Sequence, residues 1–373
     1  MSLASGQARA SSGTFLLSEE REEFRRSVRG FLERTSPESE VRRLMATDEG
    51  YDAAAWHRMA EELGLQGLAI PEEYGGSGYG WNELVLVFEE MGRALVCAPF
   101  FATVALAANA LLTAGTEEAR RDYLPGIASG DTIATLALTE DSGRWDEAAV
   151  TLAASDGRLH GHKMYVIDGH QASLIIVAAR SDDGVGLFAV EGNAPGLERT
   201  QLVTMDLTRK QARLEFDGTP ARPIGPLAPA VLDRAAVALA AEQAGSAARC
   251  LEMATDYANE RIQFGRPIGS FQAIKHKCAE LLMEVESARS AAYYAGWAAG
   301  EAEDELAVAA PLAKAYCSEA FFHAAADNIQ IHGGIGVTWE HPAHLYFKRA
   351  KTSELLLGDP AYHRELLAQR LGI

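Results

Sequence analysis

The spacing of apolar residues divides the chain into three parts, and the first part has the pattern of helices. From about residue 17 to residue 127, apolar positions recur every three or four residues, as at Phe24 and Val28, which predicts amphipathic helices. Ser18, followed by two glutamates, is a typical N-terminal cap. The glycine- and proline-rich segment IPEEYGGSGYG at 70–80 predicts an ordered loop. Further helices are expected at 81–95, 98–113 and 116–127.

The middle part, from residue 132 to about residue 227, has short β-type segments that alternate with turn signals such as Asp217-Gly218. This spacing predicts a small antiparallel barrel or sandwich. The expected strands are 133–138, 163–167, 174–178, 186–190 and 212–215. The segment 218–229 holds four of the 13 prolines, and we expect a connector there.

The last part is helical again, in long pieces joined by short glycine- and proline-containing connections, which is typical of an antiparallel bundle. The expected helices are 231–262, 271–301 and 306–331, with a short tail at 342–370. The chain is therefore predicted to be an α+β multidomain protein. Its expected domains are an all-α domain at 1–131, a β domain at 132–229 and a four-helix bundle at 230–373.

Composition and charge narrow the functional classes. The length of 373 residues exceeds one ordinary domain, and 48% hydrophobic with 23% charged residues is typical of globular proteins. The chain has 34 Lys and Arg residues and 52 Asp and Glu residues, so the net charge is −18. This negative field repels phosphate backbones and anionic lipids, so we expect no nucleic-acid binding.

Targeting and metal signals are weak. No apolar run reaches the ~20 residues of a membrane helix. The N-terminal segment 1–14 lacks the apolar core of a signal peptide, so we expect a cytoplasmic protein without membrane insertion. The four cysteines lie far apart with no CxxC pair, so no metal site is expected.

The first chemical cluster is ERIQFGRPIGSFQ, at the junction of two predicted helices. We expect Gly265 to end one helix in the left-handed conformation and Ser270 to cap the next. The last helical turn would then present Arg261, Gln263 and Phe264. A guanidinium group beside an aromatic ring suits a ligand with a phosphate and an aromatic ring system.

The second cluster is QIHGGIG, which follows a predicted helix. Two adjacent glycines, Gly333 and Gly334, stop a helix, and they also let a diphosphate approach the backbone closely. Gln330 adds a side-chain amide. A plain helix stop remains the alternative for this cluster when it is taken alone.

These clusters, together with YGGSG at 74–78, LTE at 138–140 and KMYVI at 163–167, resemble the acyl-CoA dehydrogenase family in order and spacing over nearly the whole chain. The family fold has an N-terminal helical domain, a central β domain and a C-terminal four-helix bundle. This order agrees with the division that the apolar pattern predicts.

The resemblance implies non-covalent FAD and an acyl-CoA substrate. Four residues would meet the flavin ring, with Tyr165 where a stacking Trp is common and Ile167 where a Thr is frequent; these are Leu138, Thr139, Tyr165 and Ile167. A second set would contact a flavin across a subunit interface: Arg261, Gln263, Phe264, Phe271, Gln272, Gln330, Gly333 and Gly334. A shared site implies a dimer or tetramer, either homomeric or α2β2 with a related chain. The implied electron acceptor is an electron-transfer flavoprotein or a similar protein.

The implied reaction is α,β-dehydrogenation of the thioester, in which a carboxylate removes the α-proton. The commonest family position of this base falls on Leu357, and a second falls near Ala235, so neither position holds a carboxylate. Glu242 is the candidate base, because it is the only charged residue between residues 235 and 248 and its helical neighbours are small and mostly apolar. Burial would make its carboxylate a stronger base. A water-facing surface glutamate is the alternative.

Three residues complete the expected substrate contacts. The Leu357 N–H would bind the thioester oxygen, since a backbone donor does not depend on the side chain. Trp145 stands where the family has a segment near the CoA pantetheine, and Arg234 would meet a CoA phosphate. A helix-surface role is the alternative for Arg234.

Two other functions stay open. The empty base position at Leu357 is compatible with a half-site or non-catalytic subunit of a heteromeric dehydrogenase. An oxidase or flavin monooxygenase would share the fold. The DNA-binding alkylation-response type conflicts with the charge of −18. The small residues around Glu242 would leave room for a branched or ring-bearing acyl group, as in steroid and branched-chain catabolism.

Overall fold

The computed structural model describes residues 18–373, so the segment 1–14 lies outside the described residues. The N-terminal part is helical, as predicted. The Ser18 hydroxyl accepts a hydrogen bond from the Arg21 N–H at 3.2 Å and caps the first helix. The helices are α1 (Glu19–Thr35), α2 (Glu38–Met45), α3 (Ala53–Leu63), α4 (Trp81–Arg93), the π-helix η2 (Phe101–Ala108), α5 (Asn109–Ala114) and α6 (Glu117–Ala128). The predicted loop at 70–80 contains one short 3-10 turn, η1 (Glu72–Tyr74).

The middle part is an eight-stranded sheet in the order β6-β7-β3-β2-β4-β5-β8, with β1 beside β4. Its strands are β1 (Ala134–Ala137), β2 (Ala153–Ser155), β3 (Arg158–Ile167), β4 (Leu174–Ser181), β5 (Gly184–Glu191), β6 (Leu197–Gln201), β7 (Gln211–Pro220) and β8 (Arg222–Pro226). The pairing is antiparallel except where β4 pairs with β1 and with β2. The predicted β domain is therefore present, but it is not purely antiparallel.

Three strands lack the apolar alternation on which the prediction rested. β2 and β6 expose most of their residues, and β8 contains two prolines. The expected connector at 218–229 is wrong, because β7 ends and β8 forms within it. An edge strand can hold prolines, since its outward N–H groups need no partner. Among residues 18–373, β8 pairs only with β5.

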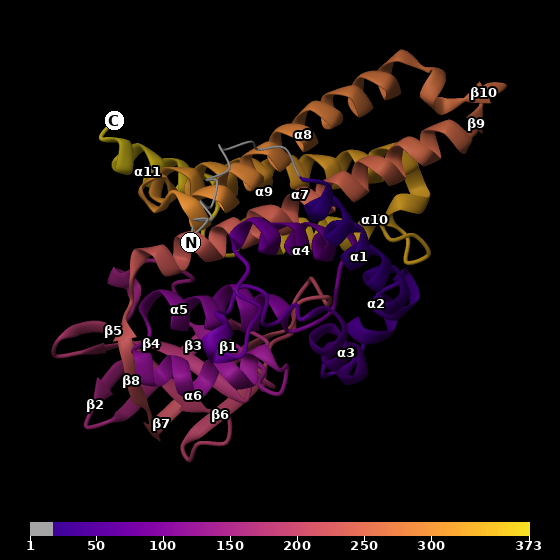
Figure 1. Cartoon of the computed structure of the whole chain (residues 1–373). Coiled ribbons are helices and arrows are strands. Elements are labelled where there is room, and N and C mark those ends of the chain that lie inside the picture. The colour runs from indigo at the N-terminus through magenta and orange to yellow at the C-terminus, as the bar shows by residue number, and fades with distance from the viewer. Residues whose placement is uncertain (1–17) are drawn as a thin grey trace, which may run out of the picture.

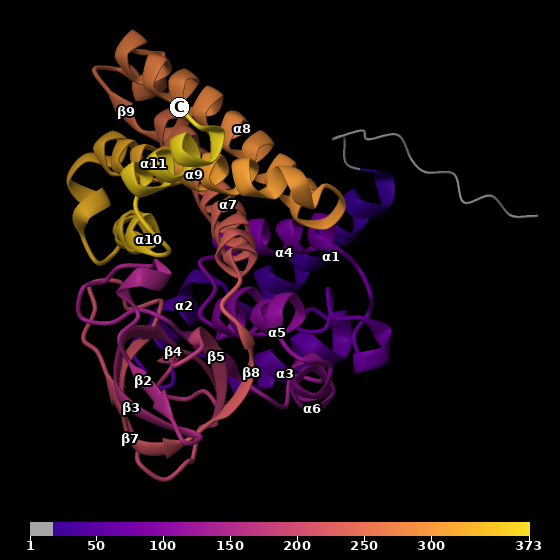
Figure 2. The same cartoon turned by 90° about the vertical axis from the view of Figure 1, so that its left-hand side faces the viewer.

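The last part is the predicted helical bundle. Its helices are α7 (Pro229–Glu260), α8 (Gln272–Glu301), α9 (Glu303–His332), α10 (Ala343–Leu355) and α11 (Pro360–Leu371). Figures 1 and 2 show the bundle on one side of the molecule and the sheet on the other, with the N-terminal helices against both. The exact domain limits at 131 and 229 stay predictions. No helix among residues 18–373 is long and apolar enough to cross a membrane.

The junction between α7 and α8 differs from the prediction. A two-stranded hairpin, β9 (Ile262–Gln263) and β10 (Arg266–Pro267), follows α7. Gly265 is left-handed with φ 76°, but it lies in the hairpin turn and does not end a helix. Ser270 does not cap α8, since Phe271 is the residue before its first turn and no side chain caps it. Glycine and proline do interrupt the helical pattern here, but they are equally compatible with a hairpin.

Two glycines set the closest approach of the N-terminal helices to the bundle. A Cβ at Gly92 of α4 would lie 1.9 Å from the Glu242 carbonyl oxygen, and one at Gly245 of α7 would lie 1.8 Å from the Glu89 carbonyl oxygen. The Ser246 hydroxyl also donates to the Gly92 carbonyl at 2.9 Å. The backbone around Glu242 is therefore pressed directly against α4.

Candidate functional site

A cleft of about 760 Å³ lies between the sheet domain and the C-terminal helices. Its lining comes from the loop after β1, from β3, from the β6–β7 connection, and from α10, α11 and the turn between them. The residues are Gly143, Arg144, Trp145, Asp146, Tyr165, Thr204, Met205, Gln211, Lys351, Thr352, Leu355, Leu356, Gly358, Asp359 and Tyr362. The cleft thus contains Tyr165 and Trp145, two of the residues that the sequence predicted.

The segment with Leu138 and Thr139 is held against β3 and does not line this cleft. The Thr139 hydroxyl donates to the Met164 carbonyl at 2.7 Å, and the buried Lys163 ammonium donates to the Leu138 carbonyl at 2.9 Å. Lys163 also pairs with Glu140 at 2.7 Å. Burial opposes the charge of Glu140, but hydrogen bonds from Lys163 and its other partners outweigh burial and lower the pKa of Glu140 to about 2. This pair was not predicted from the sequence.

The second predicted set lies elsewhere in the chain. Arg261, Gln263 and Phe264 belong to the β9–β10 hairpin and its approach, not to a last helical turn. All three are exposed, and the Phe264 side chain is 90% exposed. Figure 1 shows this hairpin at the end of the bundle away from the sheet. One chain therefore does not bring this set together with Tyr165.

The glycine cluster lies after α9. Gly333 ends this helix with φ 64°, as predicted. A Cβ at either Gly333 or Gly334 would meet nothing within 4 Å, so the backbone is open to a large group. Gln330 is exposed on the same helical end, whereas Phe271 and Gln272 begin α8 after the hairpin. This arrangement gives an accessible backbone, which suits a diphosphate.

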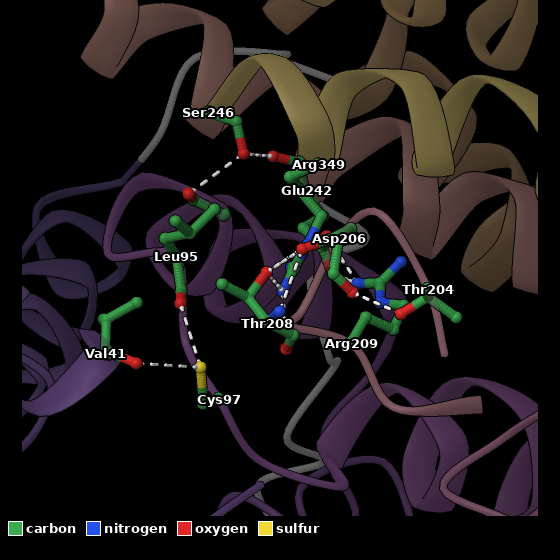
Figure 3. A network of polar contacts seen from close by, with 11 residues as sticks. Val41, Leu95, Cys97, Thr204, Asp206, Thr208, Arg209, Glu242, Ser246 and Arg349 are labelled. Atoms are coloured by element: carbon green, nitrogen blue, oxygen red, sulfur yellow. Dashed lines mark hydrogen bonds and ion pairs between the residues drawn. The ribbon is translucent and has the colours of Figure 1, made fainter. Parts of the chain in front are cut away.

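Glu242 is buried in α7, with 4% of its surface exposed, so the surface alternative is wrong. Its carboxylate is held by two guanidinium groups (Figure 3). Arg209 Nη2 donates to both carboxylate oxygens at 2.6 Å, and Arg349 Nη1 donates to Oε1 at 3.1 Å. Arg349 Nε also donates to Asp206 Oδ2 at 2.9 Å. Four charged side chains thus form one buried network, which we call the ion-pair quartet: Glu242, Arg209, Arg349 and Asp206.

The quartet leaves almost no free space beside Glu242. The adjacent cavity is about 20 Å³, which is room for about one water molecule. Arg209 also lies over the Phe101 ring, 4.9 Å from its centroid. Ile167, a predicted flavin contact, lines this small cavity. The predicted ring contacts therefore divide between the small cavity and the large cleft.

The carboxylates raise the pKa of Arg349 although burial opposes its charge. Burial lowers the pKa of Arg209, which Glu242 partly offsets. Asp168, which also lines the small cavity, lacks a direct ion pair among the described residues, and burial raises its pKa to about 7. The partners of Glu242 could not be predicted from the sequence, because they lie 33 and 107 residues away from it in the chain.

The remaining substrate candidates do not form one group. Leu357 is buried in the turn between α10 and α11, with φ 62°. Arg234 makes its contacts elsewhere. It pairs with Glu303 at 2.9 Å, and it lines a different pocket of about 460 Å³ beside Trp81. Within residues 18–373, no group of three His, Cys, Asp or Glu side chains could hold a metal ion.

Comparison with known proteins gives the family. Residues 18–131 match the model described as acyl-CoA dehydrogenase, N-terminal domain, and residues 226–372 match that of the C-terminal domain. The chain is 38% identical over 349 residues to the acyl-CoA dehydrogenase IpdE2 of Mycobacterium tuberculosis (strain ATCC 25618 / H37Rv), a match that covers 94% of this chain and 95% of that protein. The chain belongs to the acyl-CoA dehydrogenase family.

Solved structures are similar to this acyl-CoA dehydrogenase over almost its whole length. The Tcur3481-Tcur3483 steroid ACAD has a TM-score of 0.86 and 34% identity, covering 95% of this chain and 98% of that chain. The ChsE4-ChsE5 complex from Mycobacterium tuberculosis has a TM-score of 0.89 and 30% identity, covering 96% and 99%. The predicted family, its oxidoreductase class and its fold are therefore confirmed.

The quartet predicts a large stability effect at Arg349. Replacing it in Arg349→Met leaves two buried carboxylates with one guanidinium group, and breaking a buried pair in this way costs about 3–5 kcal/mol. Urea unfolding of both proteins measures the difference. The control Arg364→Met removes a surface partner of Glu319 and should cost less than about 1 kcal/mol. Equal effects of the two substitutions would contradict the importance of the quartet.

Asp168 predicts a pH dependence. Its pKa is raised in the folded protein, so folding binds its proton more tightly than the unfolded chain does. Burial of Asp168 therefore does not lower the free energy of unfolding below about pH 4, where the side chain is protonated in both states. The destabilisation grows as the pH rises and reaches its full value above about pH 7. Asp168→Asn lacks this term, so its free energy of unfolding should increase relative to wild type by about 2–4 kcal/mol between these pH values. A constant difference across the range would show that Asp168 ionises normally.

Proposed function

We propose that the chain is one subunit of an FAD-dependent enzyme that introduces an α,β double bond into an acyl-CoA thioester, and that it works with a second, related chain. The proposal has two parts, a flavin site shared between subunits and a reaction that does not use Glu242 of this chain. The single observation that carries it is the closed, doubly ion-paired state of Glu242.

The residues present fit FAD. Tyr165 and Trp145 line a cleft large enough for a flavin ring, and Gly333 and Gly334 leave open backbone for a diphosphate. When bound, the flavin accepts the hydride that leaves the β-carbon of the substrate. The hairpin with Arg261 lies at the end of the bundle away from the sheet domain (Figure 1), so we propose that it serves a flavin held by another subunit. This separation supports an oligomer as the functional unit.

Glu242 is poorly arranged to act as a base. A base must point a carboxylate oxygen at the α-carbon of the thioester, within reach of its proton. Both Glu242 oxygens instead accept hydrogen bonds from guanidinium groups, and the cavity of about 20 Å³ cannot admit a thioester. We therefore propose a structural role for Glu242, with the base supplied by the second chain.

A catalytic Glu242 is the second candidate function. Two observations favour it. Glu242 is buried, and it lines the same small cavity as Ile167, a predicted flavin contact. For this function, Arg209 and Arg349 would have to move away when the substrate binds. The cost of separating a buried carboxylate from two cations argues against this movement.

The relatives support a two-chain enzyme with a bulky substrate. Two similar solved structures carry the names of two chains, and one of these is called a steroid ACAD. We propose a ring-bearing acyl-CoA as the substrate class, bound where the second chain leaves an open acyl pocket. The proposed electron acceptor is an electron-transfer flavoprotein or a similar protein; rapid reoxidation of the reduced flavin by air would instead indicate an oxidase.

Flavin bleaching tests the role of Glu242. The chain is co-purified with a related chain from the same source, and steroid acyl-CoA is added without oxygen. We expect the Glu242→Gln complex to bleach at a rate within about threefold of wild type, because the base lies on the other chain. The control Glu319→Gln changes a surface ion pair on α9. FAD content and melting temperature are measured for each complex, and loss of bleaching in a folded, FAD-loaded Glu242→Gln complex would establish Glu242 as the base.

A further inference from the structure

Lys314 has a buried amino group that no proposed step uses. It lies in α9 with 0% of its surface exposed. Its ammonium group donates to the Ser318 hydroxyl at 2.9 Å, to the Glu354 carbonyl at 3.2 Å and to the Gly358 carbonyl at 3.1 Å. Among the described residues it has no carboxylate at ion-pair distance. Burial of an ammonium group without a counterion is unfavourable, so its three hydrogen bonds have a specific structural purpose.

Two of these bonds hold the turn between α10 and α11. Leu357 has φ 62° and Gly358 has φ 103°, so both are left-handed. A left-handed leucine is unfavourable because its Cβ crowds the backbone, and such a conformation persists only where its surroundings enforce it. His363 of α11 supplies a further restraint, since its ring Nε2 lies 3.0 Å from the Leu357 carbonyl oxygen. His363 therefore contacts the carbonyl group of the strained Leu357, and Lys314 binds that of the adjacent left-handed Gly358.

This turn forms one wall of the large cleft. Leu356, Gly358 and Asp359 all line the cleft of about 760 Å³. Leu357 is only 3% exposed, yet its N–H has no acceptor among the described residues. A buried backbone donor without a partner is rare, and it points to an acceptor that a ligand would supply. The turn thus shapes the cleft through Leu356 and Gly358, and it holds an unpaired donor on Leu357, between these two lining residues.

We propose that Lys314 and His363 are positioning residues that hold residues 355–358 in the left-handed turn, and so fix the cleft wall and the direction of the Leu357 N–H. Neither side chain touches the ligand in this proposal. The identity of the ligand as a flavin or thioester rests on the proposed function, whereas the restraint of the turn does not.

The charges around Lys314 define its pH response. It faces Cys317 on its own helix, Glu354 of α10, Asp359 before α11 and His363 of α11. Glu354 is paired with Lys351, and burial raises the pKa of Cys317 to about 12, so neither neutralises the ammonium group. Burial lowers the pKa of Lys314 to about 7 and that of His363 to about 3. His363 is thus neutral and can donate its Nε2–H to Leu357.

Opening of the turn is therefore linked to a proton. When the turn opens and Lys314 meets water, its pKa returns to about 10.4, so opening takes up a proton between about pH 7 and pH 10. Raising the pH over this range makes opening less favourable. The protection of the turn against hydrogen exchange should accordingly increase by up to about tenfold for each pH unit above pH 7.

Hydrogen exchange of the full chain tests this proposal. Protection factors for residues 355–358, corrected for intrinsic exchange, are measured at about pH 7 and about pH 8.5 in wild type, Lys314→Met and Lys277→Met. The control Lys277→Met removes a surface partner of Asp327. We expect Lys314→Met to lower turn protection at least about tenfold and to abolish its increase with pH, without lowering the melting temperature, because the substitution also removes a buried charge. The proposal would be overturned if Lys314→Met kept both the wild-type protection of residues 355–358 and the wild-type increase of this protection with pH.

Flavin binding tests the connection to the cleft. In the co-purified complex, Lys314→Met and His363→Phe should each weaken FAD about tenfold, and the double variant should lose less than the product of the two effects because both residues act on one turn. A loosened turn with unchanged FAD affinity would contradict the role in the cleft. If the wild-type complex binds no FAD, the proposed function fails, and the exchange measurement still decides the role of Lys314.

Discussion

The ion-pair quartet is the interaction on which the arrangement of the molecule depends. It joins Glu242 of α7 and Arg349 of α10 to Asp206 and Arg209, which lie between β6 and β7. Arg209 also contacts Phe101 of the N-terminal helices. All three parts of the chain therefore meet at one buried network. Since each charge would be costly to bury alone, the network stabilises the fold only when all the parts are docked.

In the proposed two-chain function, the same network distinguishes this chain from a one-chain enzyme. The place where the family resemblance led us to expect a free carboxylate is filled by guanidinium groups, while the open cleft and the exposed hairpin remain available to ligands and other subunits. A chain can thus keep the surfaces that hold a shared cofactor while its own acyl pocket is closed. In the proposed function, this division lets the family fold persist in a subunit that contributes to catalysis without performing the proton transfer.

The sequence predicted most of the fold, because helical periodicity and turn residues are local signals. It also located Glu242, Tyr165, Trp145 and Gly333 at features that the structure contains. What it missed is non-local. Arg349 and Lys314 look like ordinary helix-surface residues in the sequence, and only tertiary packing shows their burial. Likewise, glycine and proline after α7 marked a change of direction without showing that a hairpin would form.

The stoichiometry of acyl-CoA binding tests the central claim most directly. A titration calorimeter measures how many molecules of a tight-binding, non-reactive acyl-CoA analogue bind to the FAD-loaded two-chain complex. A closed niche beside Glu242 predicts one analogue for every two chains. One analogue for every chain would mean that Arg209 and Arg349 release Glu242 and admit the thioester, which would contradict a purely structural role for this carboxylate.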